Sequence, residues 1–107
     1  MQQEETARVF SALGNDVRLK VFLALAAEGD GGLQPAEIIR RFGVQPATLS
    51  FHLKVLADAN LLSRYRRDGL IHYKLKSTRL LHLMETFASD LHKEASAASE
   101  YQAGERR

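Results

Sequence analysis

The stretch that decides the fold runs from Val44 to Leu56 and reads VQPATLSFHLKVL. Proline at the first position of a helix costs no hydrogen bond, so we expect a helix that begins near Pro46. At the helical period, Leu49, Leu53 and Leu56 fall on one narrow stripe. A stripe of three leucines must be buried, and the sequence therefore predicts a helix that is anchored to a core along this side.

The opposite side of this helix carries small, hydroxyl-bearing, cationic and aromatic side chains. They are Ala47, Thr48, Ser50, Phe51 and Lys54. The major groove of B-DNA admits one α-helix, and short side chains let the helix backbone approach the base edges. Taken alone, the stretch favours an ordinary amphipathic surface helix. The segments before and after it favour a helix that binds DNA.

A second, shorter helix is expected directly before it. The segments Gln34–Glu37 and Gln45–Thr48 read QPAE and QPAT, so both helices open with proline at their first position. Gly43 ends the first helix, and only the segment 43–45 separates the two. Two helices joined by a few residues with a glycine form a helix-turn-helix unit, whose second helix reads DNA.

A β-hairpin is expected after the helix-turn-helix unit. The segments 61–67 and 70–76 flank Asp68-Gly69, which is a preferred type I′ turn, and the second segment alternates with period two. The hairpin carries three arginines, Arg64, Arg66 and Arg67. Isolated hairpins carry surface arginines for solubility, but a basic hairpin in this position is typical of a wing that contacts DNA phosphates or the minor groove.

Three further helices complete the prediction: residues 4–13, a core helix capped by Asn15 or Asp16, and a last helix over residues 78–97. The glycine-rich segment 28–32 is expected to be a flexible connector. The last helix is more apolar than so small a core requires, which predicts a dimer formed through the first and last helices. The expected interface residues are Phe10, Leu80, Leu83, Met84, Phe87 and Leu91.

The composition of the 107-residue chain fits a single domain, with residues 1–97 as the DNA-binding and dimerisation domain and 98–107 as a flexible tail. Residues 38–82 hold nine lysines and arginines but two aspartates, a balance of +7, which is the pattern of a nucleic-acid face. The absence of cysteine excludes disulfides, thiolate metal sites and cysteine nucleophiles and fits a reducing cytoplasm. An N-terminus unlike a signal peptide and the lack of a long apolar run predict no membrane association. Neither paired carboxylates nor a nucleophile–base spacing indicates an enzyme.

The order helix, helix, helix-turn-helix, basic hairpin, dimer helix resembles the winged-helix repressors of the ArsR/SmtB family, from roughly Val9 to Leu91. Ser50–Leu56 (SFHLKVL) looks like the family's S-x-H-L-x-x-L motif in the recognition helix. Phe10–Arg18 is similar to its A-L-x-x-x-x-R stretch, and Ala59–Leu62 resembles its A-G-L-V step into the hairpin. Asparagine replaces the glycine of that step, and asparagine tolerates a left-handed backbone better than most residues.

The resemblance implies that Ala47, Ser50 and Phe51 face base edges, with Thr48 and Lys54 near phosphates. It also implies a mainly α fold with one hairpin, a winged helix-turn-helix, working as a homodimer on a palindromic double-stranded operator. The expected DNA-binding residues are Gln45, Ala47, Thr48, Ser50, Phe51, Lys54, Arg64, Arg66 and Arg67.

The chain departs from the metal sensors of this family, so we expect no metal and no cofactor. Gln34 and Ala36 stand where metalloid sensors have cysteines. His82 matches one zinc ligand, but its expected partners are Leu80, Lys93 and Ser96. Of the other histidines, His52 is expected to pack or form hydrogen bonds within the helix-turn-helix unit, and His72 to lie on the surface or contact a phosphate.

The leading interpretation is therefore a cytoplasmic, homodimeric transcriptional repressor, not an enzyme, whose effector, if one exists, is an unidentified small molecule or another signal. One alternative is a metal or metalloid sensor with atypical ligands from the set His82, Glu85, Asp90 and His92, or a variant whose cysteines were replaced. Another alternative is a winged-helix module that binds protein and not DNA, which the +7 centre argues against.

Overall fold

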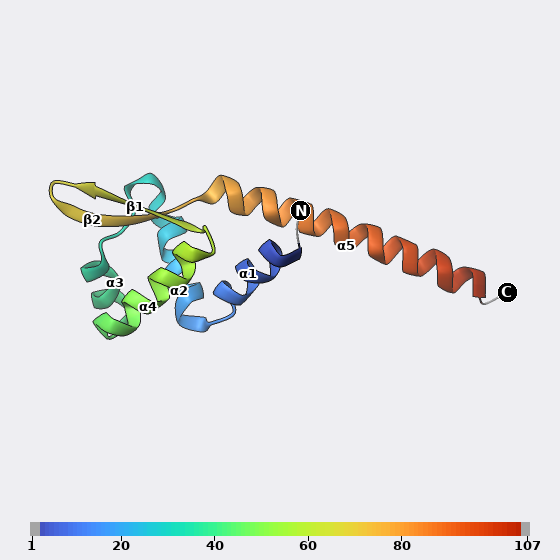
Figure 1. Cartoon of the computed structure of the whole chain (residues 1–107), viewed down its shortest axis with the longest axis horizontal. Coiled ribbons are helices and arrows are strands. Elements are labelled where there is room, and N and C mark those ends of the chain that lie inside the picture. The colour runs from blue at the N-terminus through green and yellow to red at the C-terminus, as the bar shows by residue number, and fades with distance from the viewer. Residues whose placement is uncertain (1–2, 106–107) are drawn as a thin grey trace.

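The computed structural model describes residues 3–105, without the side chains of residues 77 and 100–105. Within this part, five α-helices, one short 3-10 helix and one hairpin follow in the order expected for a winged helix (Figure 1). The elements are α1 (Gln3–Leu13), α2 (Asp16–Glu28), η1 (Gly29–Gly31), α3 (Pro35–Phe42), α4 (Pro46–Asp58), β1 (Leu62–Arg67), β2 (Leu70–Leu75) and α5 (Ser77–Glu105). The fold class predicted from the sequence is confirmed.

The core lies where α1, α2, α4, the base of the hairpin and the beginning of α5 meet. The stripe predicted for α4 is buried, with Leu49, Leu53 and Leu56 at 1%, 3% and 0% exposure. They pack in one cluster with Val9 and Ala12 of α1, Val21, Phe22 and Leu25 of α2, Leu33, Ile38, Ala59, Leu61, Leu62 and Leu83. Burying a leucine or isoleucine side chain stabilises a fold by about 1.5–3 kcal/mol, so this cluster determines how α4 is rotated.

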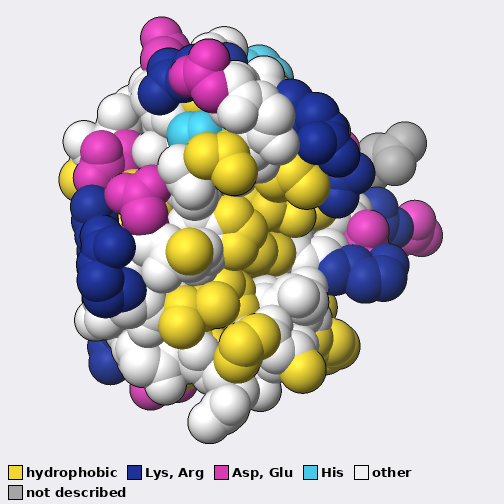
Figure 2. All heavy atoms as spheres, turned by 90° about the vertical axis from the view of Figure 1, so that its left-hand side faces the viewer, with side chains coloured by type: hydrophobic (Ala, Val, Ile, Leu, Met, Phe, Trp, Pro, Cys, Tyr) yellow, Lys and Arg dark blue, Asp and Glu magenta, His cyan; other side chains and the backbone are white. Residues whose placement is uncertain are grey.

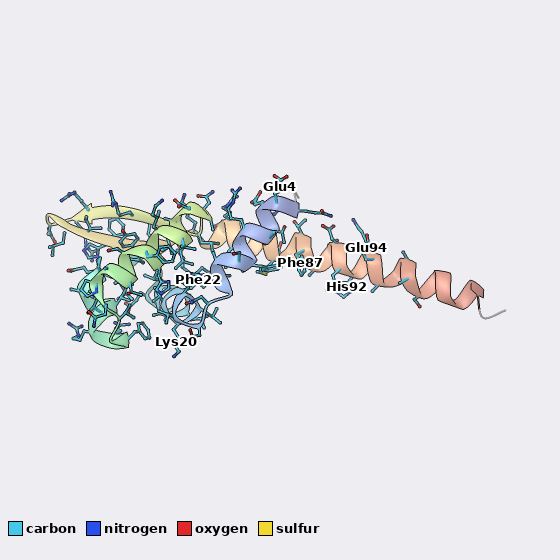
Figure 3. The ribbon with its side chains drawn as sticks, turned by 60° about the horizontal axis from the view of Figure 1, so that its bottom comes forward. Glu4, Lys20, Phe22, Phe87, His92 and Glu94 are labelled. Carbon is cyan, nitrogen blue, oxygen red and sulfur yellow. The ribbon has the colours of Figure 1, made fainter. Side chains whose placement is uncertain are left out.

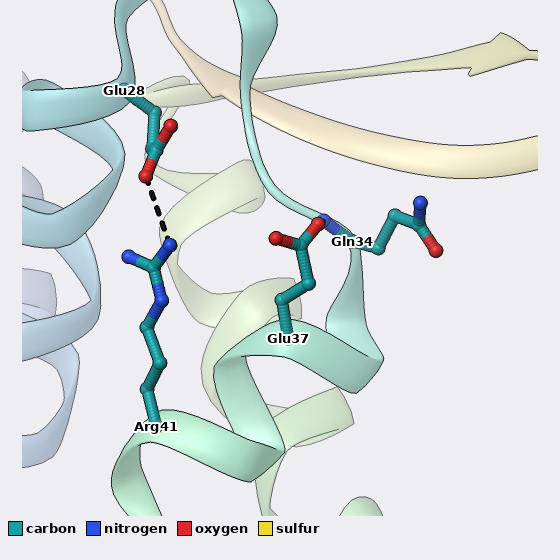
Figure 4. Close-up of polar contacts among 4 residues, drawn as sticks. All are labelled: Glu28, Gln34, Glu37 and Arg41. Carbon is teal, nitrogen blue, oxygen red and sulfur yellow. Dashed lines mark hydrogen bonds and ion pairs between the residues drawn. The ribbon is translucent and has the colours of Figure 1, made fainter.

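Side chains cap the starts of α2 and α3. The Asn15 side chain accepts a hydrogen bond of 3.0 Å from the backbone N–H of Arg18 and so caps α2. At the start of α3, the backbone N–H of Gln34 donates to the Glu37 carboxylate at 3.1 Å (Figure 4). An ion pair of 3.0 Å between Arg41 and Glu28 joins the end of α3 to the end of α2. The ion pair therefore holds α3 against α2.

The hairpin has the register and turn that the sequence predicts. Leu62 pairs with Leu75 at the base and Arg67 with Leu70 at the tip. Asp68 and Gly69 have φ angles of 53° and 77°, which is the combination that a type I′ turn requires. Asn60, at the step from α4 into β1, is also left-handed, with φ 63°.

The glycine-rich segment before α3 is fastened to the hairpin, so its prediction as a flexible connector is wrong. The backbone groups of Leu33 and Tyr73 exchange two hydrogen bonds of 2.9 Å, which form an isolated antiparallel bridge to β2 beside the two-stranded sheet. The Tyr65 hydroxyl donates to the carbonyl of Gly31 at 2.6 Å. A single paired residue has no sequence period, and the composition of the segment therefore indicated only a loop.

The last helix is longer than expected, ending at Glu105 where the sequence predicted Ala97. Alanine and glutamate, which favour helices, recur in residues 94–98 and beyond, and this explains why the helix continues. It extends away from the body of the molecule, whose longest dimension is 67 Å (Figure 1). Whether residues 98–107 are flexible stays a prediction, and residues 106 and 107 lie outside the described part. Among the described residues, no helix has both the length and the apolar character needed to cross a membrane.

We predict that Gly32→Ala destabilises the protein more than Gly29→Ala, by about 2 kcal/mol, because an added Cβ at Gly32 collides with packed backbone. A Cβ at Gly32 would lie 2.3 Å from the Tyr73 carbonyl oxygen, whereas at Gly29 it meets no described atom within 4 Å. The two glycines share a left-handed φ, 64° and 65°, so both variants carry the same backbone strain. Urea unfolding followed by circular dichroism measures the difference, and equal midpoints would contradict the collision.

Candidate nucleic-acid interface

The exposed side of α4 holds every residue that the sequence predicts to read DNA. Gly43 ends α3 in the left-handed conformation, and its N–H donates to the carbonyl of Ile39 at 2.8 Å. The chain then turns through Gln45, and Pro46 takes the first position of α4. The side chains that remain exposed are Gln45, Ala47, Thr48, Ser50, Phe51 and Lys54. Because the leucine stripe is buried, these side chains face the solvent.

Phe51 is the large apolar side chain of that exposed set. It is 60% exposed, and its ring centroid lies 5.8 Å from that of His52. Figure 2 views the end of the molecule formed by α3, α4 and the hairpin tip; hydrophobic side chains gather at its centre, and lysines and arginines lie along its edges. An exposed aromatic on a helix of this kind is suited to packing on a thymine methyl group.

Lys54 forms an exposed ion pair of 2.9 Å with Asp58, one turn further along α4. Exposed pairs of this kind contribute at most about 1 kcal/mol, so a phosphate can compete for the ammonium group. Lys54, Ser50 and Arg64 line one hollow of about 650 Å³ between α4 and the hairpin. The recognition helix and the base of the wing therefore share a continuous cationic surface.

The three wing arginines, Arg64, Arg66 and Arg67, are exposed on β1. Arg66 reaches around the turn, where its guanidinium donates to the carbonyl of Gly69 at 3.3 Å. Tyr65 lies between these arginines in the strand and stacks on His72 with centroids 5.2 Å apart. Tyr65 also bonds the α2–α3 segment, which attaches its face of the hairpin to the body. Arg64 and Arg66 lie on the other face and Arg67 on the same face as Tyr65, and all three arginines remain exposed.

His72 is buried, and the prediction that it lies on the surface or contacts a phosphate is wrong. It is 6% exposed under the Tyr65 ring, and no acceptor or donor in the described chain reaches its Nδ1. The alternation of β2 places His72 on the side of the sheet that the α2–α3 segment covers. The sequence did not predict that the α2–α3 segment covers this side of the sheet, so it did not predict that His72 is buried.

His52 connects the recognition helix to α1 and α2. The sequence predicted that it packs or bonds within the helix-turn-helix unit, but its hydrogen-bond partner Arg18 lies on α2, outside that unit. The side chain is 7% exposed, and its Nδ1 lies 3.1 Å from Nη1 of Arg18. The Nε of the same arginine donates to the carbonyl of Ala12 at 2.6 Å. Because guanidinium only donates, His52 accepts at Nδ1 and is neutral in this arrangement.

The residues predicted to form the dimer interface differ in how exposed they are. Phe10 and Phe87 form an edge-to-face pair, with centroids 4.9 Å apart, and each is 37% exposed. Leu91 is 58% exposed, while Leu80 and Met84 are half-buried. Figure 3 shows Phe87 on the part of α5 beside α1, with His92 and Glu94 on the part that extends beyond it.

Leu83 is a core residue, so its assignment to the dimer interface is wrong. It is 1% exposed and anchors the start of α5 to the protomer's own core. Leu83, Phe87 and Leu91 do lie on one helical stripe, but Leu83 is buried in the core, Phe87 packs on Phe10 and Leu91 is largely exposed. Leu81, which lies outside the predicted interface set, is 61% exposed.

Comparison with known proteins supports the assignment made from geometry. A model of a helix-turn-helix domain matches residues 13–65. The transcriptional repressor SdpR of Bacillus subtilis is 32% identical over 72 residues, which cover 67% of this chain and 77% of SdpR. The chain belongs to the ArsR/SmtB family of winged-helix transcriptional regulators.

Two further similarities fit this family. A homologue of the cadmium resistance regulatory protein CadC from Staphylococcus aureus is 32% identical over 82 residues, which are 76% of this chain. The match spans 65% of the length of that relative. The homodimeric winged helix-turn-helix domain Mb0332 of Mycobacterium bovis, described as a possible ArsR-family regulator, superposes with a TM-score of 0.63 at 26% identity over 85% of this chain and 84% of that one.

In the described part of a single protomer, no three histidine, aspartate or glutamate side chains gather as a metal site would require. The sequence did not predict the role of Arg18 in positioning α4, which comes from its hydrogen bonds to Ala12 and His52. Arg18 belongs to the stretch that resembles the family, but its partners, Ala12 and His52, lie on two other elements.

The pKa of His52 is lowered from its ordinary 6.5, first by burial and then by the positive charge of Arg18, with Asp16 acting in the opposite direction. Between 6.5 and the lowered value, the unfolded chain binds more protons at this position than the folded chain does. Stability from this group is therefore present above pH 6.5 and is lost as the pH falls through that window.

We predict that the free energy of unfolding decreases as the pH falls below 6.5, and that His52→Gln makes this slope shallower. Glutamine keeps an acceptor for Arg18 but does not titrate. Urea unfolding at a series of pH values provides the measurement, with His92→Gln as a control for removing an exposed histidine. An unchanged slope in His52→Gln would show that the ring does not bind its proton more weakly in the folded state.

Proposed function

We propose that this protein is a sequence-specific DNA-binding repressor that acts in the cytoplasm as a homodimer on a palindromic operator. One observation carries the proposal: the exposed face of α4 presents its polar set at the same end of the molecule as the wing arginines, while three buried leucines prevent the helix from turning. An exposed helix of this kind fits the major groove, and a basic hairpin beside it fits the flanking backbone.

The α4 residues divide by the groups they would meet. Ala47, Ser50 and Phe51 face base edges in this proposal, and Thr48 and Lys54 lie near phosphates. Gln45, just before the helix, contacts the DNA at the helix N-terminus. Arg64, Arg66 and Arg67 add sequence-independent affinity, because phosphate contacts position a protein without reading sequence.

The dimer supplies the spacing that two reading helices require. Helices that enter successive major grooves must be held about 34 Å apart, which one protomer cannot provide. The half-exposed pair of Phe10 and Phe87, together with Leu91, supports an interface formed by α1 and α5. The homodimeric state of the Mycobacterium bovis domain supports the same assembly.

We infer that soft metals are not the signal, although one relative is named for cadmium resistance. Thiolate sulfur is the ligand that selects soft metal ions, and this chain has no cysteine. His82 would need ligands at positions that hold Leu80, Lys93 and Ser96. An effector of another chemical class fits this sequence better.

We predict that two variants separate sequence reading from backbone attraction. Phe51→Ala should weaken binding to operator DNA by roughly 1–3 kcal/mol for each half-site, the range for one base contact, and leave random-DNA binding unchanged. Arg66→Ala combined with Arg67→Ala should weaken both. It removes two phosphate contacts from each of two protomers, so it should lower the slope of log affinity against log salt by about 4. Fluorescence anisotropy with the DNA upstream of the protein's own gene, at several salt concentrations, measures these effects.

The charge-matched control is Arg8→Ala combined with Lys20→Ala, which removes two exposed cations from α1 and α2. It should change the salt slope much less than the wing variant does. If the slope of the wing variant equals that of the control, the hairpin does not contact DNA. A strong loss of thermal stability in Phe51→Ala would instead mean that the ring serves the fold.

We predict that Phe87→Glu converts the dimer to a monomer and removes operator binding, because it places a charge in an apolar contact. Leu81→Glu is the matched control on the same helix, since Leu81 is 61% exposed and lies on a different face. Sedimentation velocity gives the oligomeric state of both. A stable Phe87→Glu dimer would remove this part of α5 from the interface.

A further inference from the structure

A second candidate site lies at the base of the hairpin, away from the wing tip. Here α1, η1, the end of β2 and the start of α5 surround a hollow of about 580 Å³. Small-molecule sites in proteins usually measure about 300–1,000 Å³. The side chains that line this hollow come from elements that the DNA interface does not use, apart from the hairpin.

Nitrogen donors dominate the lining. Lys74, Lys76, Arg79 and His82 all contribute to it, against the carboxylates of Glu5 and Asp30. The two lysines are held by neutral groups: the ammonium of Lys76 donates to the Asn60 side chain at 2.6 Å, and that of Lys74 lies 5.5 Å from the centre of the Tyr65 ring. In the described part of the chain, neither ammonium has a carboxylate within ion-pair distance. Their positive charges are therefore available to a ligand.

Arg79 has a donor that the protein leaves unused. Its Nη2 forms an ion pair with Glu5, which joins the start of α5 to α1. Its Nε is buried, and no acceptor in the described residues reaches it. A buried donor without an acceptor is unfavourable. The Arg79 side chain therefore gains charge-assisted hydrogen bonds if it turns toward an oxyanion bound in the hollow.

We propose that this hollow binds a small multivalent oxyanion, such as a di- or tricarboxylate or a phosphate ester. The anion occupies the space between Lys74, Lys76 and Arg79, and competes with Glu5 for the Arg79 guanidinium. A guanidinium binds carboxylate and phosphate oxygens in the same forked geometry, so both kinds of oxyanion fit the same donors. A single neutral ligand would leave the two lysine charges unused.

Binding of such an anion would act on the contact between α1 and α5. The Glu5–Arg79 pair is an electrostatic link between these helices, and the Phe10–Phe87 pair is another contact between them. An anion that takes Arg79 removes the first link and changes how α1 rests on α5. This step rests on the proposed function: the changed contact between α1 and α5 lowers operator affinity because the same helices hold the dimer.

Calorimetric titration of the full chain with citrate and with pyrophosphate tests the binding site, at constant ionic strength set with chloride. We expect saturable binding of at least one of them, and which one binds distinguishes a carboxylate ligand from a phosphate ligand. Arg79→Gln should lower the affinity about tenfold or more, as the loss of a charged hydrogen-bond donor implies. Arg8→Gln removes the same charge from an exposed position of α1 and should have little effect.

Glu5→Gln gives the sharper result because it removes the internal competitor. It should raise the affinity for the anion about two- to fivefold, which corresponds to the loss of one partly exposed ion pair. Glu4→Gln is the matched control: it makes the same change in net charge one residue earlier on α1 and does not line the hollow. Equal affinities for the Glu5 and Glu4 variants, or no saturable binding of either anion, would overturn the proposal.

Nuclear magnetic resonance can locate the bound anion. The Nε–H of Arg79 should give a separate side-chain signal, assigned by its loss in Arg79→Gln, that shifts during the titration with the same affinity. A signal that stays in place while heat is released would place the anion elsewhere and reject this site.

The effect on DNA is measured separately, by anisotropy with and without the anion at fixed ionic strength. Loss of operator affinity in the wild type but not in Arg79→Gln would support the coupling, and equal affinities would reject it. Since the calorimetric titration contains no DNA, failure of the binding site and failure of the proposed DNA-binding function are distinguished.

Discussion

The burial of three leucines of α4 against the helices that precede it is the constraint on which the rest of the structure depends. A helix bound along one stripe can neither roll nor slide without exposing apolar surface, so the direction of every other α4 side chain is determined. Arg18 adds a polar restraint to the same helix by joining His52 to the end of α1. Packing of the leucines fixes the rotation of α4, and the hydrogen bonds of Arg18 fix the position of α4 along its axis.

Periodic and local features could be predicted from the sequence. The leucine stripe, the prolines that open α3 and α4, the Asp68-Gly69 turn and the left-handed Asn60 each depend on a few neighbouring residues, and the structure agrees with them. The helical period of α4 also predicted which of its residues are exposed, because it assigns each residue to one face of the helix or the other.

Features that depend on contacts between distant residues could not be predicted in this way. The bridge between Leu33 and Tyr73 joins segments about forty residues apart, and no period marks either partner. The burial of His72 follows from that bridge. Leu83 shows a related problem, since an apolar stripe on α5 looks the same whether the protein's own core or a partner covers it. The hollow around Arg79 is assembled from four elements, which no single stretch of sequence reveals.

The paired backbones of Leu33 and Tyr73 restrict where this chain can accept extra residues. Surface loops usually tolerate insertions, because closing a longer loop costs little free energy. The segment between α2 and α3 is exposed, but an insertion there would break the pairing with β2, and the hairpin would lose the support that sets its angle to α4. An insertion beside Asp68 would only extend the tip. Evolution or engineering can therefore lengthen the reach of the hairpin at its tip, while its direction is maintained by a loop whose length must not change.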